Sequence, residues 1–134
     1  LQAAQFARNR GAKVIGVAGG PEKCAYLMNE LHLAGAIDYK ESRSAHGRTV
    51  AEQLDALAPD GVDFFMDQVG GDILDTVLER LKPNARVVIC GGISQYDGNL
   101  NHGKVRENQE FCQFEVHMSL FTLIFCRYKD HRII

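Results

Sequence analysis

Short apolar runs alternate with amphipathic stretches along this chain, and the two patterns predict different elements. Short continuous apolar runs are typical of strands that are covered on both faces. One such run is found at 13–18, and the less continuous apolar-rich segments at 36–39, 62–67 and 85–90 are also predicted to be strands. Apolar residues spaced by three or four predict helices at 1–10, 21–31, 50–57 and 73–81. Thr49 and Glu52 form a capping-box pattern that begins the third helix, and Pro83 is expected to end the fourth.

This alternation predicts an α/β fold built on a doubly wound parallel sheet of the Rossmann type, with right-handed crossovers. A polar connection at 41–47, a Gly- and Asn-rich loop at 97–104, a weakly helical stretch at 105–114 and a strand at 116–125 complete the prediction. The chain opens inside a helical pattern and contains no complete G-x-G-x-x-G. We therefore expect an N-terminally truncated domain that lacks its first strand and its diphosphate loop.

Composition and charge exclude several classes of protein. With 134 residues, 46% hydrophobic and 24% charged, the chain fits one globular domain. A net charge of −2 gives no reason to expect nucleic acid or an anionic membrane as a partner. The longest apolar-rich run, at 118–126, is far shorter than the roughly 18 residues of a membrane helix.

Cysteine and histidine spacing bears on redox state and metal binding. The four cysteines form no C-x-x-C pair, so we expect free thiols in a reducing cytoplasm. The five histidines show no H-E-x-x-H or Cys/His ligand spacing, and we predict no metal site.

The candidate chemistry lies just after each predicted strand, because doubly wound sheets bind ligands outside the carboxyl ends of their strands. In dinucleotide-binding sheets an acidic residue after the second strand binds the ribose 2′-hydroxyl and would repel a 2′-phosphate. This chain has Gly19 and Gly20 at that place, and Lys23 follows one helical turn later. A lysine near the positive end of a helix favours a phosphate, so the pattern fits NADP better than NAD.

Each of these residues also has an ordinary structural explanation, and the sequence pattern does not decide between coenzyme binding and a structural role. Lys23 could be an exposed first-turn lysine, Tyr39 a half-buried strand residue and Asp67 the cap of the next turn. Gly70 and Gly71 suit either a close approach of the backbone to a ligand or a tight turn.

Several motifs in order resemble one family. They are found at 17–24, 36–40, 60–63, 67–71 and 89–96, and the resemblance runs from residue 1 to about residue 126. The family is the zinc-free medium-chain dehydrogenases/reductases that include prostaglandin reductase, curcumin reductase and the plant alkenal double-bond reductases. The resemblance implies that residues 1–134 are part of an NADP-binding Rossmann domain. It also implies a GroES-like substrate domain and a C-terminal helix that this chain does not contain.

The implied activity is NADPH-dependent reduction of the C=C bond of an α,β-unsaturated ketone or aldehyde. Hydride would go to the β-carbon, and the enolate oxygen would need a hydrogen-bond donor. Tyr96 matches the tyrosine that closes the I-S-x-Y motif of the family and is the predicted catalytic residue. The resemblance implies these NADP(H)-binding residues: Gly19, Lys23, Tyr39, Gln68, Cys90, Gly91, Gly92, Ile93, Ser94, Gln95, Tyr96, Phe121, Thr122 and Leu123.

Two positions depart from the family pattern. Gln68 stands where the family usually has Asn, and its longer side chain puts that hydrogen bond in doubt. His32 replaces a glycine that commonly ends a helix, at a modest cost because histidine tolerates left-handed backbone better than most residues.

The resemblance also implies a homodimer, in which the strand at 116–125 pairs with its twin at an otherwise exposed sheet edge. Two other functions stay open. One is a quinone reductase of the same superfamily, and the other is a non-catalytic nucleotide-binding fragment, since we expect the isolated chain to be inactive.

Overall fold

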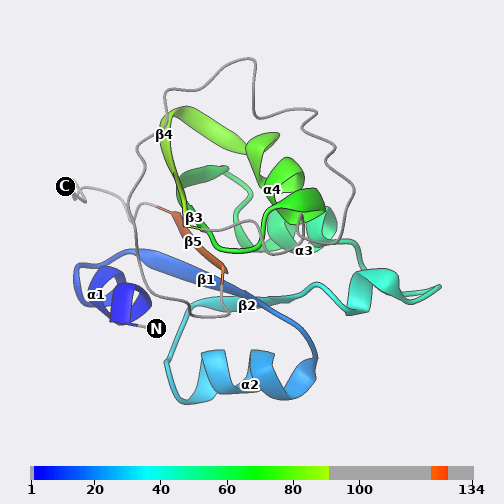
Figure 1. Cartoon of the computed structure of the whole chain (residues 1–134). Helices are drawn as coiled ribbons and strands as arrows, with labels where there is room; N and C mark the ends of the chain where they lie inside the picture. The colour runs from blue at the N-terminus through cyan, green and yellow to red at the C-terminus, as the bar shows by residue number, and fades with distance from the viewer. Residues whose placement is uncertain (1, 91–121, 127–134) are drawn as a thin grey trace.

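A computed structural model of the chain describes residues 2–90 and 122–126. Helices and strands alternate through most of it (Figure 1), as the sequence predicts. In chain order the elements are α1 (Gln2–Asn9), β1 (Lys13–Ala18), α2 (Pro21–Asn29), β2 (Gly35–Asp38), the 3-10 turn η1 (Glu41–Arg43), α3 (Val50–Leu57), β3 (Val62–Asp67), α4 (Gly71–Leu78), β4 (Leu81–Ile89) and β5 (Thr122–Cys126).

The described strands form one five-stranded sheet in the order β2-β1-β5-β3-β4. β1 pairs with β2, and β3 with β4, in parallel, whereas β5 runs antiparallel to both of its neighbours, β1 and β3. This order matches the Rossmann order 3-2-1-4-5 with β5 at the place of the first strand. The predicted doubly wound α/β fold is confirmed. Among the described strands, β5 departs from the predicted parallel sheet because it runs antiparallel to its neighbours.

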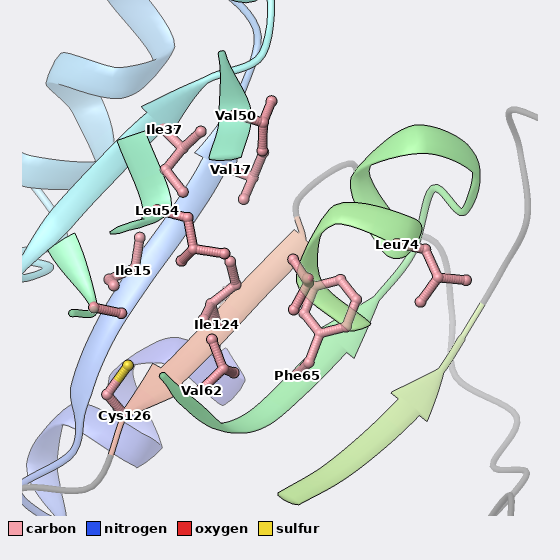
Figure 2. Close-up of a cluster of buried hydrophobic side chains, with 12 residues drawn as sticks. Ile15, Val17, Ile37, Val50, Leu54, Val62, Phe65, Leu74, Ile124 and Cys126 are labelled. Atoms are coloured by element: carbon pink, nitrogen blue, oxygen red, sulfur yellow. The ribbon is translucent and has the colours of Figure 1, made fainter. Parts of the chain in front are cut away.

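Helices cover both faces of the sheet, and each face has its own core. On one face, α3 and α4 pack on residues such as Ile15, Phe65 and Ile124 (Figure 2). On the other face, α1 and α2 pack on a second cluster that includes Val14 and Leu123. Successive residues of β1 therefore point into opposite cores, which explains why its sequence is apolar without interruption.

The local signals at helix ends are confirmed. The Thr49 side chain accepts a hydrogen bond from the Glu52 N–H, and the Glu52 carboxylate accepts one from the Thr49 N–H, so the capping box is complete. His32 has a φ of 51°, in the left-handed region where a glycine is expected. Gly11, two residues after the end of α1, has a φ of 84°.

The stretch around Pro83 differs from the prediction. α4 begins at Gly71 and ends at Leu78, earlier than the predicted 73–81, and β4 begins at Leu81, earlier than the predicted 85–90. Asn84 has a φ of 63°, and the register with β3 shifts between Val62 and Phe64. A bulge around Pro83 thus lets the strand continue, because proline and left-handed residues are tolerated at bulges of an edge strand.

The prediction that the last strand lies at an exposed edge is wrong for its described part. β5 makes ladders with β1 on one side and β3 on the other. The side chains of Leu123, Ile124 and Cys126 are buried. Residues 123–125 therefore have no open edge to offer a twin strand.

Candidate functional site

The strand exits singled out in the sequence converge on one edge of the sheet. Ala18, the last residue of β1, stands opposite Asp38 at the end of β2, and Asp67 stands opposite Ile89 at the ends of β3 and β4. Thr122 is paired with Val17, so the antiparallel β5 begins at this same edge. The predicted convergence is confirmed for the described exits.

Tyr39 lies directly against Gly19. A Cβ placed on Gly19 would come within 2.6 Å of the Tyr39 hydroxyl oxygen, so any larger residue at position 19 would require the Tyr39 ring to shift. The Tyr39 N–H donates to the Ala18 carbonyl, which continues the β1–β2 ladder by one bond. The Arg43 guanidinium carbon lies 5.7 Å from the centre of the Tyr39 ring, at the outer limit of a cation–π contact. The sequence reasoning missed Arg43, which it treated as part of a polar connection.

Lys23 is exposed in the first turn of α2. Gly20 is the N-cap residue of that helix and provides no side-chain cap, and Pro21 occupies the first helical position. The amino end of α2, with its partial positive charge, thus faces the β1 exit. This arrangement agrees with both explanations of Lys23, as a phosphate contact and as an ordinary surface lysine.

Asp38 places a carboxylate at the same corner, which the sequence reasoning did not predict. Its Oδ1 accepts hydrogen bonds from the Gly20 N–H at 2.8 Å and from the Lys40 N–H at 2.9 Å. The bond to Lys40 is the i to i+2 pattern of an Asx turn, which an aspartate at the end of a strand could have suggested. Asp38 therefore joins the exits of β1 and β2.

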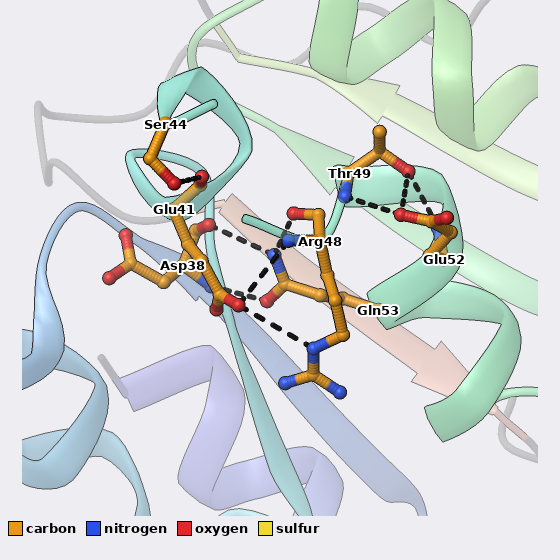
Figure 3. A network of polar contacts seen from close by, with 7 residues as sticks. All are labelled: Asp38, Glu41, Ser44, Arg48, Thr49, Glu52 and Gln53. Carbon is orange, nitrogen blue, oxygen red and sulfur yellow. Dashed lines mark hydrogen bonds and ion pairs between the residues drawn. The ribbon is translucent and has the colours of Figure 1, made fainter. Parts of the chain in front are cut away.

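Gln53 holds Asp38 from behind (Figure 3). Its buried amide accepts from the Asp38 N–H at 2.9 Å and donates to the Asp38 carbonyl at 3.1 Å. The same amide donates to the Arg48 carbonyl at 3.0 Å. Because β2 is an edge strand, Gln53 acts as a substitute neighbour for its last residue and fixes the position of the strand end.

Asp67 is fully buried at the end of β3. Its Oδ1 accepts from the N–H groups of Val69 and Gly70, at 3.1 and 3.0 Å. Burial raises the pKa of this carboxyl, and the backbone N–H groups oppose that rise. The interpretation of Asp67 as a turn cap is confirmed, and Gly70 and Gly71, with φ of 72° and 64°, make the tight turn that it holds.

Cys90 follows β4, beside Asp67. Its N–H donates to the Asp67 carbonyl at 2.7 Å. Burial first, and the negative charge of Asp67 second, raise the pKa of the Cys90 thiol. Since the thiolate is the reactive form, this environment favours a neutral thiol with a packing role. Cys24, Cys90 and Cys126 are all free.

The remaining predicted site residues are either described by the structure or lie outside its described part. Gln68 lies in the turn held by Asp67. The side chain of Leu123 is buried in the core on the α1 and α2 face, so the backbone of Leu123 is the part that can meet a ligand. Thr122 begins β5 at the site edge. Those outside the described residues are Gly91, Gly92, Ile93, Ser94, Gln95, Tyr96 and Phe121.

Comparison with known proteins settles the family. A family model described as "Zinc-binding dehydrogenase" matches residues 1–120. The chain belongs to this family. Prostaglandin reductase 1 of Rattus norvegicus is 42% identical over 93 residues, which are 69% of this chain and 26% of that protein. The NADPH-dependent curcumin reductase of Escherichia coli is 37% identical over 93 residues, 69% of this chain and 25% of that protein.

A solved member of the dehydrogenase family confirms the fold. The crystal structure of CurA from Vibrio vulnificus in complex with NADPH superposes with a TM-score of 0.64 at 31% identity, over 83% of this chain and 34% of that chain. The resemblance inferred from the sequence motifs is thus confirmed. The chain spans about a quarter of the length of the curated relatives it matches.

The description of the matching family names zinc. Within 2–90 and 122–126, no three or more His, Cys, Asp or Glu residues come together in a way that suits a metal ion. None of the helices in the described part is long and apolar enough to cross a membrane.

Proposed function

We propose that this chain is the coenzyme-binding part of an NADPH-dependent reductase that saturates the C=C bond of α,β-unsaturated ketones or aldehydes. In the whole protein, a substrate domain and a final helix would lie outside residues 1–134. The names of the relatives support this proposal, since they include prostaglandin, curcumin and 2-alkenal reductases, the last two of them named as NADPH- or NADP-dependent. The proposed substrate class is α,β-unsaturated carbonyl compounds.

The observation that carries the proposal is the chemistry of the β1 exit. Gly19 and Gly20 replace the acidic residue that would bind an unphosphorylated ribose, and Lys23 stands in the following helical turn. Tyr39 lies against Gly19 at this exit, and both its hydroxyl and the Lys23 ammonium are groups that can donate hydrogen bonds to a 2′-phosphate. The residues present thus fit NADP(H) better than NAD(H).

Each proposed residue has a separate task. The bound coenzyme supplies hydride to the β-carbon of the substrate. Lys23 and Tyr39 would hold its 2′-phosphate, and the glycines of the Asp67 turn would let the backbone approach it. Tyr96 would donate a hydrogen bond to the carbonyl oxygen of the substrate as negative charge develops there.

A labelled-hydride experiment tests this function. The protein that carries this chain is given NADPH deuterated at the transferred position and a simple enone. We expect a saturated ketone with deuterium on the β-carbon. Reduction of a quinone with no reaction of the enone would instead identify the quinone reductase, and binding of NADPH without either reaction would identify a non-catalytic nucleotide-binding protein.

Replacing Tyr96 by phenylalanine should lower enone turnover roughly tenfold, because one hydrogen bond to the substrate oxygen is lost. The measurement is steady-state turnover with a saturating enone, beside NADPH affinity by coenzyme fluorescence. NADPH affinity should stay within about twofold of the unaltered protein, since the ring is kept. Unchanged turnover would remove Tyr96 from the reaction.

Two further expectations concern the whole protein. We expect it in the cytoplasm, where three described cysteines without disulfide bonds would stay reduced. We also expect a homodimer, although contact through residues 123–125 is disfavoured because these residues of β5 are paired on both sides.

A further inference from the structure

The corner between the β1 and β2 exits carries a negative charge as well as Lys23, the cation proposed to bind the 2′-phosphate. Asp38 Oδ1 accepts two backbone hydrogen bonds, from Gly20 and from Lys40. Among residues 2–90 and 122–126 the ion pairs of the chain all join other acidic groups, and none includes Asp38. Within this described part of the chain, its charge is balanced by backbone dipoles and by cations at longer range.

The position of this charge is fixed in advance. The buried Gln53 amide holds both the N–H and the carbonyl of Asp38, and Figure 3 shows the Asp38 carboxylate pointing away from Gln53. The hydrogen bond from Gly20 then places the carboxylate at the residue that caps α2. A carboxylate held by backbone on both sides loses little further freedom when a ligand binds.

A second observation shows that the charge is felt along the first turn of α2. The pKa of the Cys24 thiol is raised, first by burial and then by the negative charges of Asp38 and Glu41. Cys24 is the residue after Lys23, so the field of Asp38 reaches the neighbourhood of the proposed phosphate contact. Glu41 is paired with Arg48 at 3.5 Å, which leaves Asp38 as the less compensated of the two acids.

We propose that Asp38 is a coenzyme-selecting residue, whose carboxylate orders the Gly19–Gly20 exit through its hydrogen bonds while its charge opposes a 2′-phosphate and so moderates the preference that Lys23 provides. The proposal rests on the proposed NADPH function and deepens it. The two roles have different signatures. Loss of the hydrogen bonds weakens the binding of both NADPH and NADH, whereas loss of the charge changes only the ratio of their affinities.

Two variants of Asp38 separate the roles. Asp38→Asn keeps an oxygen acceptor for Gly20 and Lys40 but removes the charge, and Asp38→Ala removes both. We expect Asp38→Asn to bind NADPH about fivefold more tightly, as one nearby like charge is removed, with NADH affinity within about twofold. In Asp38→Ala, NADH affinity should fall, while the ratio of the two affinities should still move towards NADPH.

Dissociation constants for NADPH and NADH, measured by coenzyme fluorescence on the protein that carries this chain, decide the matter. Asp60→Asn is the matched control, because it removes the same charge from the exposed turn before β3, at the opposite edge of the sheet. The ratio of NADPH affinity to NADH affinity should not change in Asp60→Asn. The gain in Asp38→Asn should also shrink at high salt, which a purely structural effect would not do.

The outcomes are distinguishable. An unchanged NADPH-to-NADH ratio in Asp38→Asn, in a protein that does bind NADPH, overturns the selecting role of Asp38 and leaves the proposed function intact. A protein that binds neither coenzyme overturns both proposals before any variant is made. A ratio that shifts equally in Asp60→Asn overturns the local role, since it would reflect net charge alone.

Discussion

Replacing Phe65 by alanine should lower the free energy of unfolding by about 3–5 kcal/mol. Phe65 is completely buried in the middle of β3, in the core beneath α3 and α4 (Figure 2). Its neighbours across the ladders are Ile124 of β5 and Val87 of β4. Removal of the ring leaves a cavity between three strands, and the loss is a large share of the roughly 5–15 kcal/mol that stabilise a domain.

Urea-induced unfolding, followed by far-UV circular dichroism, measures this loss. Phe6→Ala is the matched control, because the Phe6 side chain is 53% exposed on α1 and contacts the Arg10 guanidinium at 4.4 Å. Phe6→Ala should lower the free energy of unfolding by less than about 1 kcal/mol, the scale of an exposed cation–π contact. Equal losses in the two variants would mean that β3 is not the centre of this core.

Replacing Lys23 by alanine should weaken NADPH binding roughly thirtyfold and leave NADH binding within about twofold. A hydrogen bond between charged groups is among the strongest single contacts, and only NADPH has the 2′-phosphate to receive it. The Lys23 side chain is exposed and the helix end around it has no side-chain cap, so its removal should not disturb the fold. Dissociation constants for the two coenzymes give the result.

Lys23→Arg controls for charge at the same position. Arginine keeps the positive charge and adds donors suited to phosphate, so NADPH affinity should stay within about threefold of the unaltered protein. If alanine weakens NADPH and NADH alike, Lys23 acts on the fold or on the shared part of the coenzymes, and the phosphate role is wrong.

Local patterns predicted those elements whose formation depends on neighbours in sequence. β1 and β3 have the predicted bounds because each is a short run rich in apolar residues that ends at glycines or a turn. α3 begins where Thr49 and Glu52 indicate, since a capping box involves only four residues. His32 takes the left-handed conformation that its place after α2 requires.

Long-range pairing explains what the sequence could not predict. The central position of β5 depends on ladders with β1 and β3, more than fifty residues away, and nothing in its own five residues specifies a direction. β4 extends back to Leu81 because a bulge absorbs Pro83, whereas the proline alone predicts a break. Pairing across the sheet outweighed the local signal in both places.

The candidate site was predicted in outline and missed in detail. The convergence of strand exits follows from topology, so Gly19, Tyr39 and Asp67 were found. Gln53 was missed because a glutamine usually faces solvent. Its signal was present, since Val50, Gln53, Leu54 and Leu57 share one helical face and a polar residue on an apolar face needs a buried partner.

Direct titration of the unaltered protein with NADPH and with NADH tests the central claim most simply. A sheet edge that combines glycines, a lysine and a tyrosine, and lacks an acidic residue at the end of β1, should bind NADPH at least several-fold more tightly than NADH. The preference should decline as salt is added, because screening weakens the contact with the 2′-phosphate. Equal affinities, or tighter binding of NADH, would contradict the account.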